Sequence, residues 1–152
     1  GDTVLVASDV SEAKDLGEYA NRLNVPIAIV DKRREDDSEN PRAVALIGEV
    51  ENRNALIVDD EIASGGTMLE AARFIQARGA QRIEAAAVHP VLSGSAYERL
   101  IDSPIERMVV TNTIPLREDV PKGKIEVVSV ASLFADAIRA IHSGDSVSAL
   151  FV

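Results

Sequence analysis

The feature of this sequence that most constrains its fold is a short apolar run that leads through a polar loop into a helical pattern. Ala55–Val58 predicts a buried strand, and the helical pattern begins at Met68. Between them, Asp59–Thr67 contains Gly65 and Gly66. Glycines let a backbone wrap closely around an anion, and the positive end of a helix dipole attracts one. The segment therefore predicts a strand, a phosphate-binding loop and a helix in direct succession.

The polar groups of this loop indicate what it binds. Asp59 and Asp60 directly follow the predicted strand, where their carboxylates are able to bind ribose hydroxyls. The Ser64 hydroxyl and the backbone amides of Gly65–Thr67 are expected to converge on a phosphate. Sugar and phosphate together predict a phosphoribosyl group. The alternative is an acidic turn capped by Ser64, which explains the serine and threonine but not an aspartate pair at the end of a buried strand.

Along the whole chain, short β-branched runs alternate with helical patterns, which is typical of a parallel sheet covered by helices. Seven strands are predicted, at Val4–Ala7, Ile27–Val30, Val44–Ile47, Ala55–Val58, Ile83–Val88, Arg107–Val110 and Ile125–Val130. Three helices are predicted, at Ser11–Leu23, Met68–Arg78 and Ala131–His142. We expect an α/β fold with a mostly parallel, twisted sheet flanked by helices, in one domain over residues 1–152.

The ends and faces of the predicted helices follow from their residue types. Asp9 and Glu12 have the spacing of a capping box for the first helix. The last helix carries apolar residues three and four apart, so we expect it to bury one face. The residues of that face are Leu133, Phe134, Ala137, Ile138 and Ile141.

Composition limits the class of protein. The chain of 152 residues is 46% hydrophobic and has no cysteine, so it can bury one core without disulfides, as in a cytoplasmic protein. It has no apolar run near the roughly 18 residues that span a membrane. A net charge of −9 and 3% aromatic residues argue against a nucleic-acid partner. Because Gly1 leads almost at once into a strand, we expect a piece of a longer protein.

Positive charge is concentrated in one place. Lys32–Arg34 follows a predicted strand and begins the polar stretch Lys32–Arg42, which we expect to be mobile without nucleotide. Asp9, Lys32 and Asp59 each follow a strand, and ligands of open α/β sheets bind at that edge. Three loops are therefore expected to meet at one crevice. The alternative for Lys32–Arg34 is a solvated run of charges.

The loop Asp59–Thr67 resembles the phosphoribosyl-binding motif of type I phosphoribosyltransferase folds. Nearly the whole chain is similar to the C-terminal half of the ribose-phosphate pyrophosphokinase family. The stretches that carry the likeness, in the order of the family, are Val30–Arg34, Val88–Gly94, Val110–Leu116 and Ser146–Phe151.

This resemblance implies a Mg²⁺-dependent enzyme of nucleotide biosynthesis that transfers the β,γ-pyrophosphoryl group of ATP to ribose 5-phosphate, giving phosphoribosyl pyrophosphate and AMP. It implies that Lys32 and Arg34 are catalytic, that Asp59 and Asp60 hold the 2′ and 3′ hydroxyls, and that Asp9 lies near Mg²⁺. As an alternative, Asp9 is only a helix N-cap. The resemblance also implies a homo-oligomer and an absent N-terminal half, without which the chain is expected to be inactive.

Three residues depart from the family pattern. Ser11 and Glu12 stand where the family usually carries a glycine pair that accepts pyrophosphate, and Ala63 replaces an aspartate of the phosphoribosyl loop. These departures favour a non-catalytic regulatory homologue as the alternative function. A stand-alone phosphoribosyltransferase that acts on a nucleobase is a third hypothesis, but it needs a hood over the base, and the sequence offers no aromatic segment for one.

Overall fold

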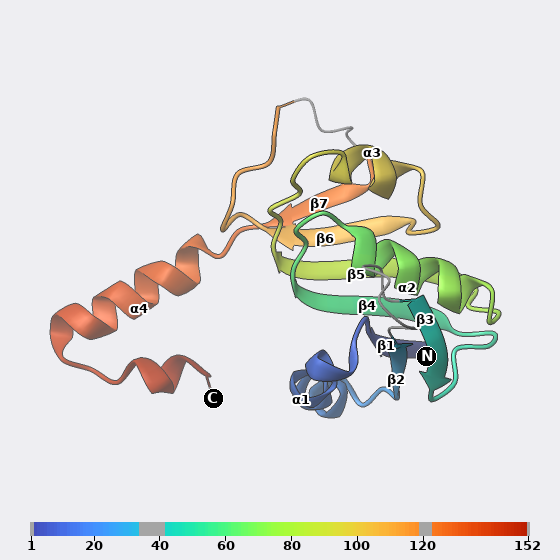
Figure 1. Ribbon diagram of the computed structural model, residues 1–152. Helices are drawn as coiled ribbons and strands as arrows, with labels where there is room; N and C mark the ends of the chain where they lie inside the picture. Colours follow the sequence, from blue (N-terminus) through green and yellow to red (C-terminus); the bar gives the residue numbers. More distant parts are fainter. Residues whose placement is uncertain (1, 34–41, 119–122, 152) are drawn as a thin grey trace.

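Seven strands form one sheet in the computed structural model, which describes residues 2–33, 42–118 and 123–151 (Figure 1). The strand order is β3-β2-β1-β4-β5-β6-β7, and all neighbours are parallel except β2 and β3. The strands are β1 (Thr3–Ala7), β2 (Ile27–Arg33), β3 (Arg42–Ile47), β4 (Asn54–Glu61), β5 (Arg82–His89), β6 (Arg107–Thr111) and β7 (Ile125–Val128). The predicted mostly parallel α/β sheet is therefore confirmed.

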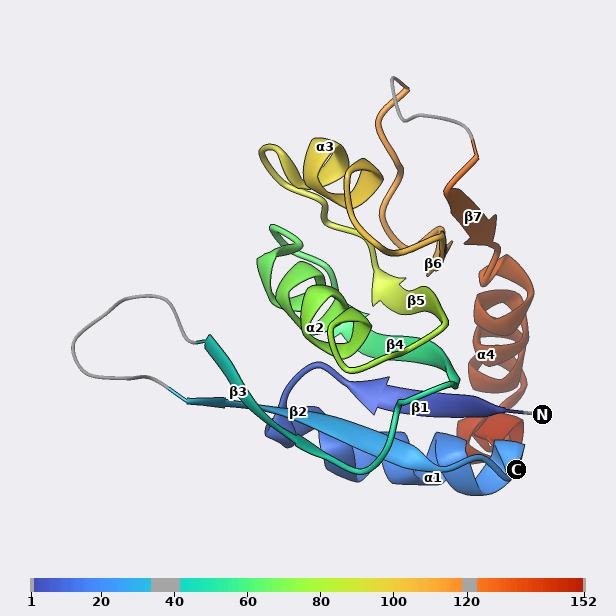
Figure 2. The same cartoon turned by 90° about the vertical axis from the view of Figure 1, so that its right-hand side faces the viewer.

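The helices lie on both faces of this sheet (Figure 2). The first is α1 (Ala13–Leu23), which follows the 3-10 turn η1 (Val10–Glu12), and the second is α2 (Gly66–Gln76). Because β1 connects to β2 in one direction and β4 to β5 in the other, right-handed crossovers place α1 and α2 on opposite faces. The expected helices at these two positions are confirmed.

The core is divided between these two faces. On one face, the strands pack against α2 and against α3 (Ala96–Ile101), with Met68, Ala72 and Ile75 buried. On the other face, Leu5 and Ala7 of β1 pack against α1. Since β1 is covered on both sides, its apolar residues form a continuous run rather than an alternating one. The sequence analysis missed α3 because six residues are too few for a helical period to be recognised.

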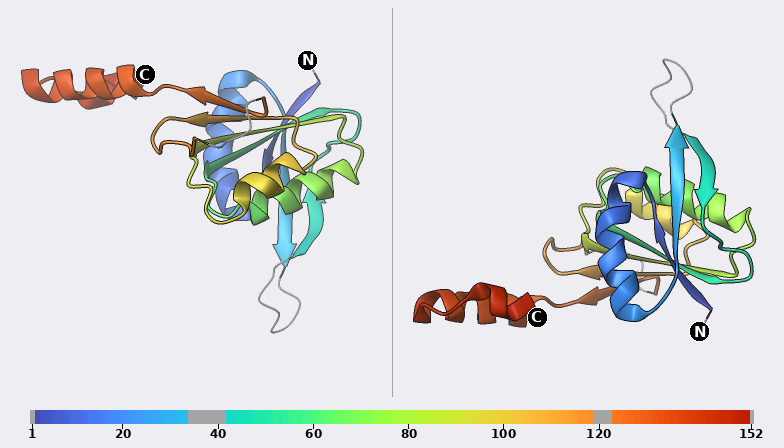
Figure 3. Two further views of the ribbon diagram at one scale, coloured as in Figure 1. Left: turned by 90° about the horizontal axis from the view of Figure 1, so that it is seen from above. Right: turned by 90° about the horizontal axis from the view of Figure 1, so that it is seen from below.

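The C-terminal part of the chain differs from expectation. The last predicted helix exists as α4 (Ala131–Ser143), followed by the turn η2 (Val147–Phe151). The prediction that α4 buries its apolar face is wrong, since Phe134 is 58% exposed and Ile138 66% exposed. The helix extends away from the sheet beyond β7 (Figure 3). Helical spacing identifies an apolar face, but it does not identify the surface that covers the face.

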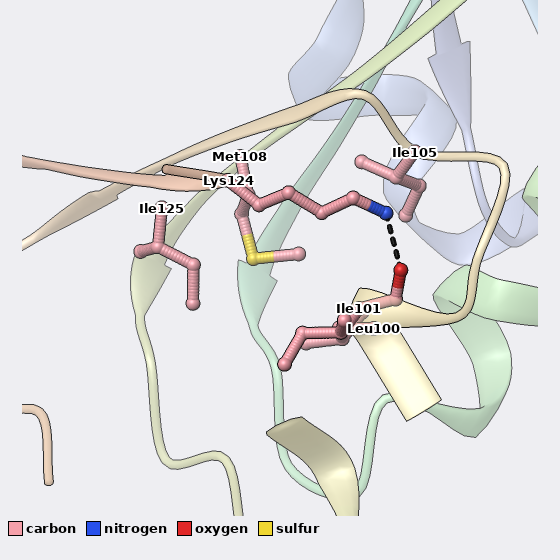
Figure 4. A pocket seen from close by; sticks show the side chains of 6 residues that line it. All are labelled: Leu100, Ile101, Ile105, Met108, Lys124 and Ile125. Carbon is pink, nitrogen blue, oxygen red and sulfur yellow. Dashed lines mark hydrogen bonds between the residues drawn. The ribbon is translucent and has the colours of Figure 1, made fainter. Parts of the chain in front are cut away.

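Lys124, which directly precedes β7, connects α3 to the sheet through hydrogen bonds. The ammonium of Lys124, next to β7, donates a hydrogen bond to the carbonyl of Ile101, the last residue of α3 (Figure 4), and another to the carbonyl of Ser103, just beyond the helix. A cation at this position stabilises the negative end of the helix dipole. The carbon chain of Lys124 lies among Leu100, Met108 and other apolar side chains. The short helix is thus held both by packing and by a charged group.

Two further observations complete the fold. None of the helices in the described ranges is long and apolar enough to cross a membrane. The expectation that Lys32–Arg42 is mobile concerns mainly residues 34–41, which lie outside the described residues.

The role of Lys124 is testable by Lys124→Met, which keeps an apolar chain of similar length but removes the donor. We expect the free energy of unfolding to fall by about 1–2 kcal/mol, because hydrogen bonds from a charged group are lost. Urea denaturation measures this change. Lys14→Met, at an exposed position of α1, is the matched control and should change stability by less than about 0.5 kcal/mol. Equal stability of Lys124→Met and wild type would contradict the assignment.

Candidate functional site

The candidate site lies where the strand order reverses. Beyond β1 the chain turns to β2 on one side, and beyond β4 it turns to β5 on the other, so a crevice opens between β1 and β4 at their carboxyl ends. The register pairs Ala7 with Val58, the last apolar residue of the β4 run. The residues that follow these two, Ser8 and Asp59, therefore meet at the mouth of the crevice.

The loop after β4 turns sharply into α2. Gly65, which immediately precedes the helix, has a φ of 74°. Residues that have a Cβ rarely adopt this backbone conformation. The loop is attached to the segment after β5, because the Leu92 amide donates to the Ile62 carbonyl at 2.8 Å and the Ser93 amide to the Ala63 carbonyl at 2.8 Å. The first amides of α2 are thereby held in place at the positive end of the helix.

Most residues of the predicted phosphate-binding loop line one cavity. Its volume is about 210 Å³, and its walls include Ser64, Gly65, Gly66 and Thr67. Glu12, Asp59 and Glu61 also line it. The structure thus places four residues of the predicted phosphate cradle and one of the two predicted ribose-binding aspartates around a single space.

Asp60 faces a second cavity of about 420 Å³. Glu12 and Asp59 line this cavity too, so the two spaces adjoin at this pair. The other lining residues are Ser11, Asp15, Leu16, Tyr19, Val58 and Val88. Four of the lining residues carry carboxyl groups, namely Glu12, Asp15, Asp59 and Asp60. Among the described residues, no lysine, arginine or histidine lines this cavity. The described lining of the second cavity is therefore acidic.

A buried serine joins the two shared carboxylates. Ser8 is completely buried, and its hydroxyl lies 3.1 Å from Glu12 Oε2 and 3.3 Å from Asp59 Oδ2. The Ser8 amide also donates to Glu12 Oε2 at 3.2 Å. The Ser8 hydroxyl has one proton, so it donates a hydrogen bond to only one of the two carboxylates. The other carboxyl group forms a hydrogen bond with the hydroxyl oxygen only when it is itself protonated, so the arrangement favours one protonated acid. Ser8, Glu12 and Asp59 thus form one hydrogen-bonded unit.

The pKa values of both acids reflect this arrangement. Burial, followed by the charge of Asp59, raises the pKa of Glu12 from 4.5 to about 7. Burial also raises the pKa of Asp59, with smaller contributions from Asp60, while the hydrogen bond from the Glu61 amide opposes the shift. Two acids at close range do not both ionise readily. The unit consequently retains a proton at a pH where isolated carboxylates have lost it.

Sequence reasoning missed this unit. It paired Glu12 with Asp9 as a capping box, whereas Glu12 reaches back to Ser8 and Asp9 accepts from the Ser11 amide at 2.8 Å. The capping box is therefore wrong in its pairing. The available signal was that Ser8 directly follows a buried strand at the same edge as Asp59, but no local pattern gives the contact across 51 residues.

The positively charged candidates are only partly visible. Lys32 lies near the carboxyl end of β2, with its backbone opposite Ala43 and three residues beyond Ile29, the partner of Ala7, and its side chain is not described. Arg34 lies outside the described residues. Neither residue is therefore placed relative to the cavities.

Asp9 was predicted near Mg²⁺. Its Oδ1 accepts hydrogen bonds from the amide and hydroxyl of Ser11, at 2.8 Å and 2.9 Å, as an N-cap does. In the described parts of the chain, no three or more histidine, cysteine or acidic residues are grouped to hold a metal ion. Mg²⁺ commonly binds through one or two carboxylates plus substrate phosphates and waters. The residues present fit that mode and do not form a closed protein cage.

Comparisons with known proteins agree with this architecture. Residues 38–152 match the family model described as the phosphoribosyl synthetase-associated domain. A ribose-phosphate pyrophosphokinase from Caldanaerobacter subterraneus is 46% identical over 99% of this chain and 47% of its own length. The corresponding protein from Aquifex aeolicus is 41% identical over 97% of this chain and 47% of its own length. The chain thus spans about half the length of these relatives.

A solved structure gives the same result. The crystal structure of phosphoribosylpyrophosphate synthetase from Mycobacterium smegmatis superposes with a TM-score of 0.83 and 31% sequence identity. The match covers 94% of this chain and 46% of the other.

The Glu12 carboxyl makes a testable contribution to stability. Because its folded pKa is raised from 4.5 to about 7, the stabilisation is present below about pH 4.5 and is lost as pH rises through 7. Glu12→Gln stays neutral and should lose less thermal stability than wild type between about pH 5.5 and pH 8. Since Glu12 is only half buried, we expect a difference of about 1 kcal/mol, or about 2–4 °C in melting temperature.

Thermal melts monitored by circular dichroism at the two pH values measure this difference. Glu18→Gln, an exposed position on α1, is the matched control and should follow wild type. If Glu12→Gln loses as much stability as wild type, the raised pKa is not a property of the folded protein.

Proposed function

The chain belongs to the phosphoribosyl synthetase-associated domain family and matches the C-terminal half of ribose-phosphate pyrophosphokinase; on that premise, we propose that it is the domain that binds ribose 5-phosphate for pyrophosphoryl transfer from ATP. The observation that carries the proposal is the 210 Å³ cavity, which is lined both by the residues of the phosphate cradle and by Asp59. A sugar phosphate needs both kinds of group around one space.

In this proposal the 5-phosphate lies against the amides of Gly65–Thr67 and the Ser64 hydroxyl. The furanose ring extends toward Asp59 and Asp60, whose carboxylates accept hydrogen bonds from the 2′ and 3′ hydroxyls. Charge-assisted hydrogen bonds of this kind are stronger than neutral ones. The phosphate provides most of the affinity, and the hydroxyls orient the anomeric carbon.

Pyrophosphoryl transfer from ATP to the anomeric hydroxyl depends on positioning and charge neutralisation. We assign Lys32 and Arg34 to the transferring phosphoryl oxygens, since lysine supplies a mobile point charge and arginine a bidentate contact. Mg²⁺, when bound, would further neutralise the charge of the ATP phosphates, and Asp9 is the carboxylate proposed to lie near it. Homo-oligomerisation of the full-length protein is part of the same proposal.

The alternative is a non-catalytic homologue that retains the fold and regulates an active synthetase. The acidic wall of the second cavity favours it, because Glu12, Asp15, Asp59 and Asp60 repel polyphosphate. Ribose 5-phosphate binding is common to both functions, and turnover distinguishes them.

The phosphate cradle is tested by Gly65→Ala. A Cβ at Gly65 meets no atom closer than 3.7 Å, but a φ of 74° strains an alanine, so the loop amides should shift. We expect the affinity for ribose 5-phosphate, measured by calorimetry, to fall by about tenfold, or 1.4 kcal/mol. Gly144→Ala introduces the same strain at a φ of 75° at the end of α4 and should bind as wild type. Unchanged affinity of Gly65→Ala for ribose 5-phosphate would show that the loop is not part of the binding site.

Turnover is the second test. The chain alone should form almost no AMP from ATP and ribose 5-phosphate with Mg²⁺, because lost orientation of the reactants is worth about 7–11 kcal/mol of barrier. A fusion to the N-terminal half of the Caldanaerobacter subterraneus relative should restore turnover if the domain is catalytic. An inactive fusion that still binds ribose 5-phosphate supports the regulatory homologue, and equal activity of chain and fusion contradicts the need for a second half.

A further inference from the structure

Ser8 is a fully buried polar residue that the proposed binding of ribose 5-phosphate does not use. Its exposed fraction is 0%, and it directly follows β1. A buried hydroxyl forms hydrogen bonds with protein groups, so the partners of Ser8 show what it does. These partners are Glu12 and Asp59, which both line the two cavities, whereas Ser8 lines neither.

The backbone and the hydroxyl of Ser8 have different partners available. The Ser8 amide donates to Glu12 Oε2 at 3.2 Å, and the hydroxyl oxygen lies 3.1 Å from the same atom and 3.3 Å from Asp59 Oδ2. Because the amide already supplies Glu12 with a donor, the one hydroxyl proton is available to Asp59. When Glu12 is protonated, it donates to the hydroxyl oxygen and again leaves the hydroxyl proton to Asp59.

The Asp59 carboxylate is thereby held at both of its oxygens. Oδ2 accepts from the Ser8 hydroxyl, and Oδ1 accepts from the Glu61 amide at 3.4 Å. A carboxylate has about four acceptor positions, so these two donors leave acceptor capacity for a ligand hydroxyl. Asp60, in contrast, is exposed and lines only the second cavity. A side chain that is held before the ligand arrives loses little freedom on binding, and this preorganisation increases affinity.

We propose that Ser8 is a positioning residue, whose buried hydroxyl holds the Asp59 carboxylate in the orientation that accepts a hydrogen bond from a sugar hydroxyl. This step rests on the proposed binding of ribose 5-phosphate. It makes a residue outside the phosphate cradle responsible for part of the affinity for the sugar, and for none of the affinity for the phosphate.

The test measures the affinity of the chain for ribose 5-phosphate and for inorganic phosphate by calorimetry, with EDTA so that no divalent ion takes part. Ser8→Ala removes only the hydroxyl oxygen. It should weaken the binding of ribose 5-phosphate about fivefold, because Asp59 is then free to turn, and leave the affinity for inorganic phosphate within about twofold. A residue that supports only the fold would weaken both ligands alike.

Two further variants sharpen this comparison. Ser8→Cys has a similar size and a weaker donor, so its affinity for ribose 5-phosphate should lie between those of Ser8→Ala and wild type, and it gives the same comparison if Ser8→Ala does not fold. An Asp59→Ala background shows whether the effect passes through Asp59 or through Glu12. In that background, Ser8→Ala should change the affinity for ribose 5-phosphate by less than about twofold, since the carboxylate that Ser8 positions is gone.

Ser103→Ala is the matched control, because it removes a hydroxyl that donates to the Leu100 carbonyl and lines neither cavity. It should bind both ligands as wild type does. Wild-type affinity of Ser8→Ala for ribose 5-phosphate, equal weakening of both ligands, or an undiminished further loss in the Asp59→Ala background overturns the role of Ser8 while the binding of ribose 5-phosphate stands. If wild type and Ser103→Ala do not bind ribose 5-phosphate, the proposed function fails, and the role of Ser8 fails with it.

Discussion

The parallel pairing of β1 with β4 is the constraint on which the rest of the structure depends. Their register places Ala7, the last residue of β1, beside Val58 of β4, so Ser8 and Asp59 follow at the same level of the sheet. A shift by one residue would turn every side chain of one strand to the other face of the sheet and would separate Ser8 from Asp59. The same pairing is where the strand order reverses, and it therefore forms the crevice and brings the β1 and β4 loops to it.

Local sequence pattern predicted much of this architecture. The strand, loop and helix around Asp59–Thr67 were recognisable because apolar runs and glycines act over a few residues. The hydrogen bonds of Ser8 were not recognisable, because they join groups that approach each other only when β1 and β4 pair. The alternation of strands and helices gave the sheet, but periodicity could not give the order of its strands.

The apolar face of α4 shows a second limit of what sequence pattern predicts. Its period was recognised and the helix exists, yet the four large residues of that face, Leu133, Phe134, Ile138 and Ile141, are exposed. Helical spacing shows that a helix has an apolar face, but it does not identify the surface that covers this face. Lys32 and Arg34 belong to a run of charged residues, and no sequence pattern in such a run predicts where its side chains lie.

The cavities and their charges connect fold to proposed function. One space combines helix amides with Asp59, as a sugar phosphate requires, and the adjoining space is acidic. Burial of Glu12 and Asp59 around one serine hydroxyl raises the pKa of both and fixes the wall between the two spaces. The groups proposed to bind the sugar phosphate thus lie at the ends of β1 and β4 or in the segments that follow them.

The central claim is that the amino end of α2 holds the phosphate of ribose 5-phosphate. Nuclear magnetic resonance of the ¹⁵N-labelled chain, titrated with ribose 5-phosphate, tests it most directly, because each backbone amide reports separately. The account predicts saturable changes that are largest at the amides of Gly65, Gly66 and Thr67, with Gly144 unaffected. Saturable changes that leave these three amides in place and fall on another part of the chain would contradict it.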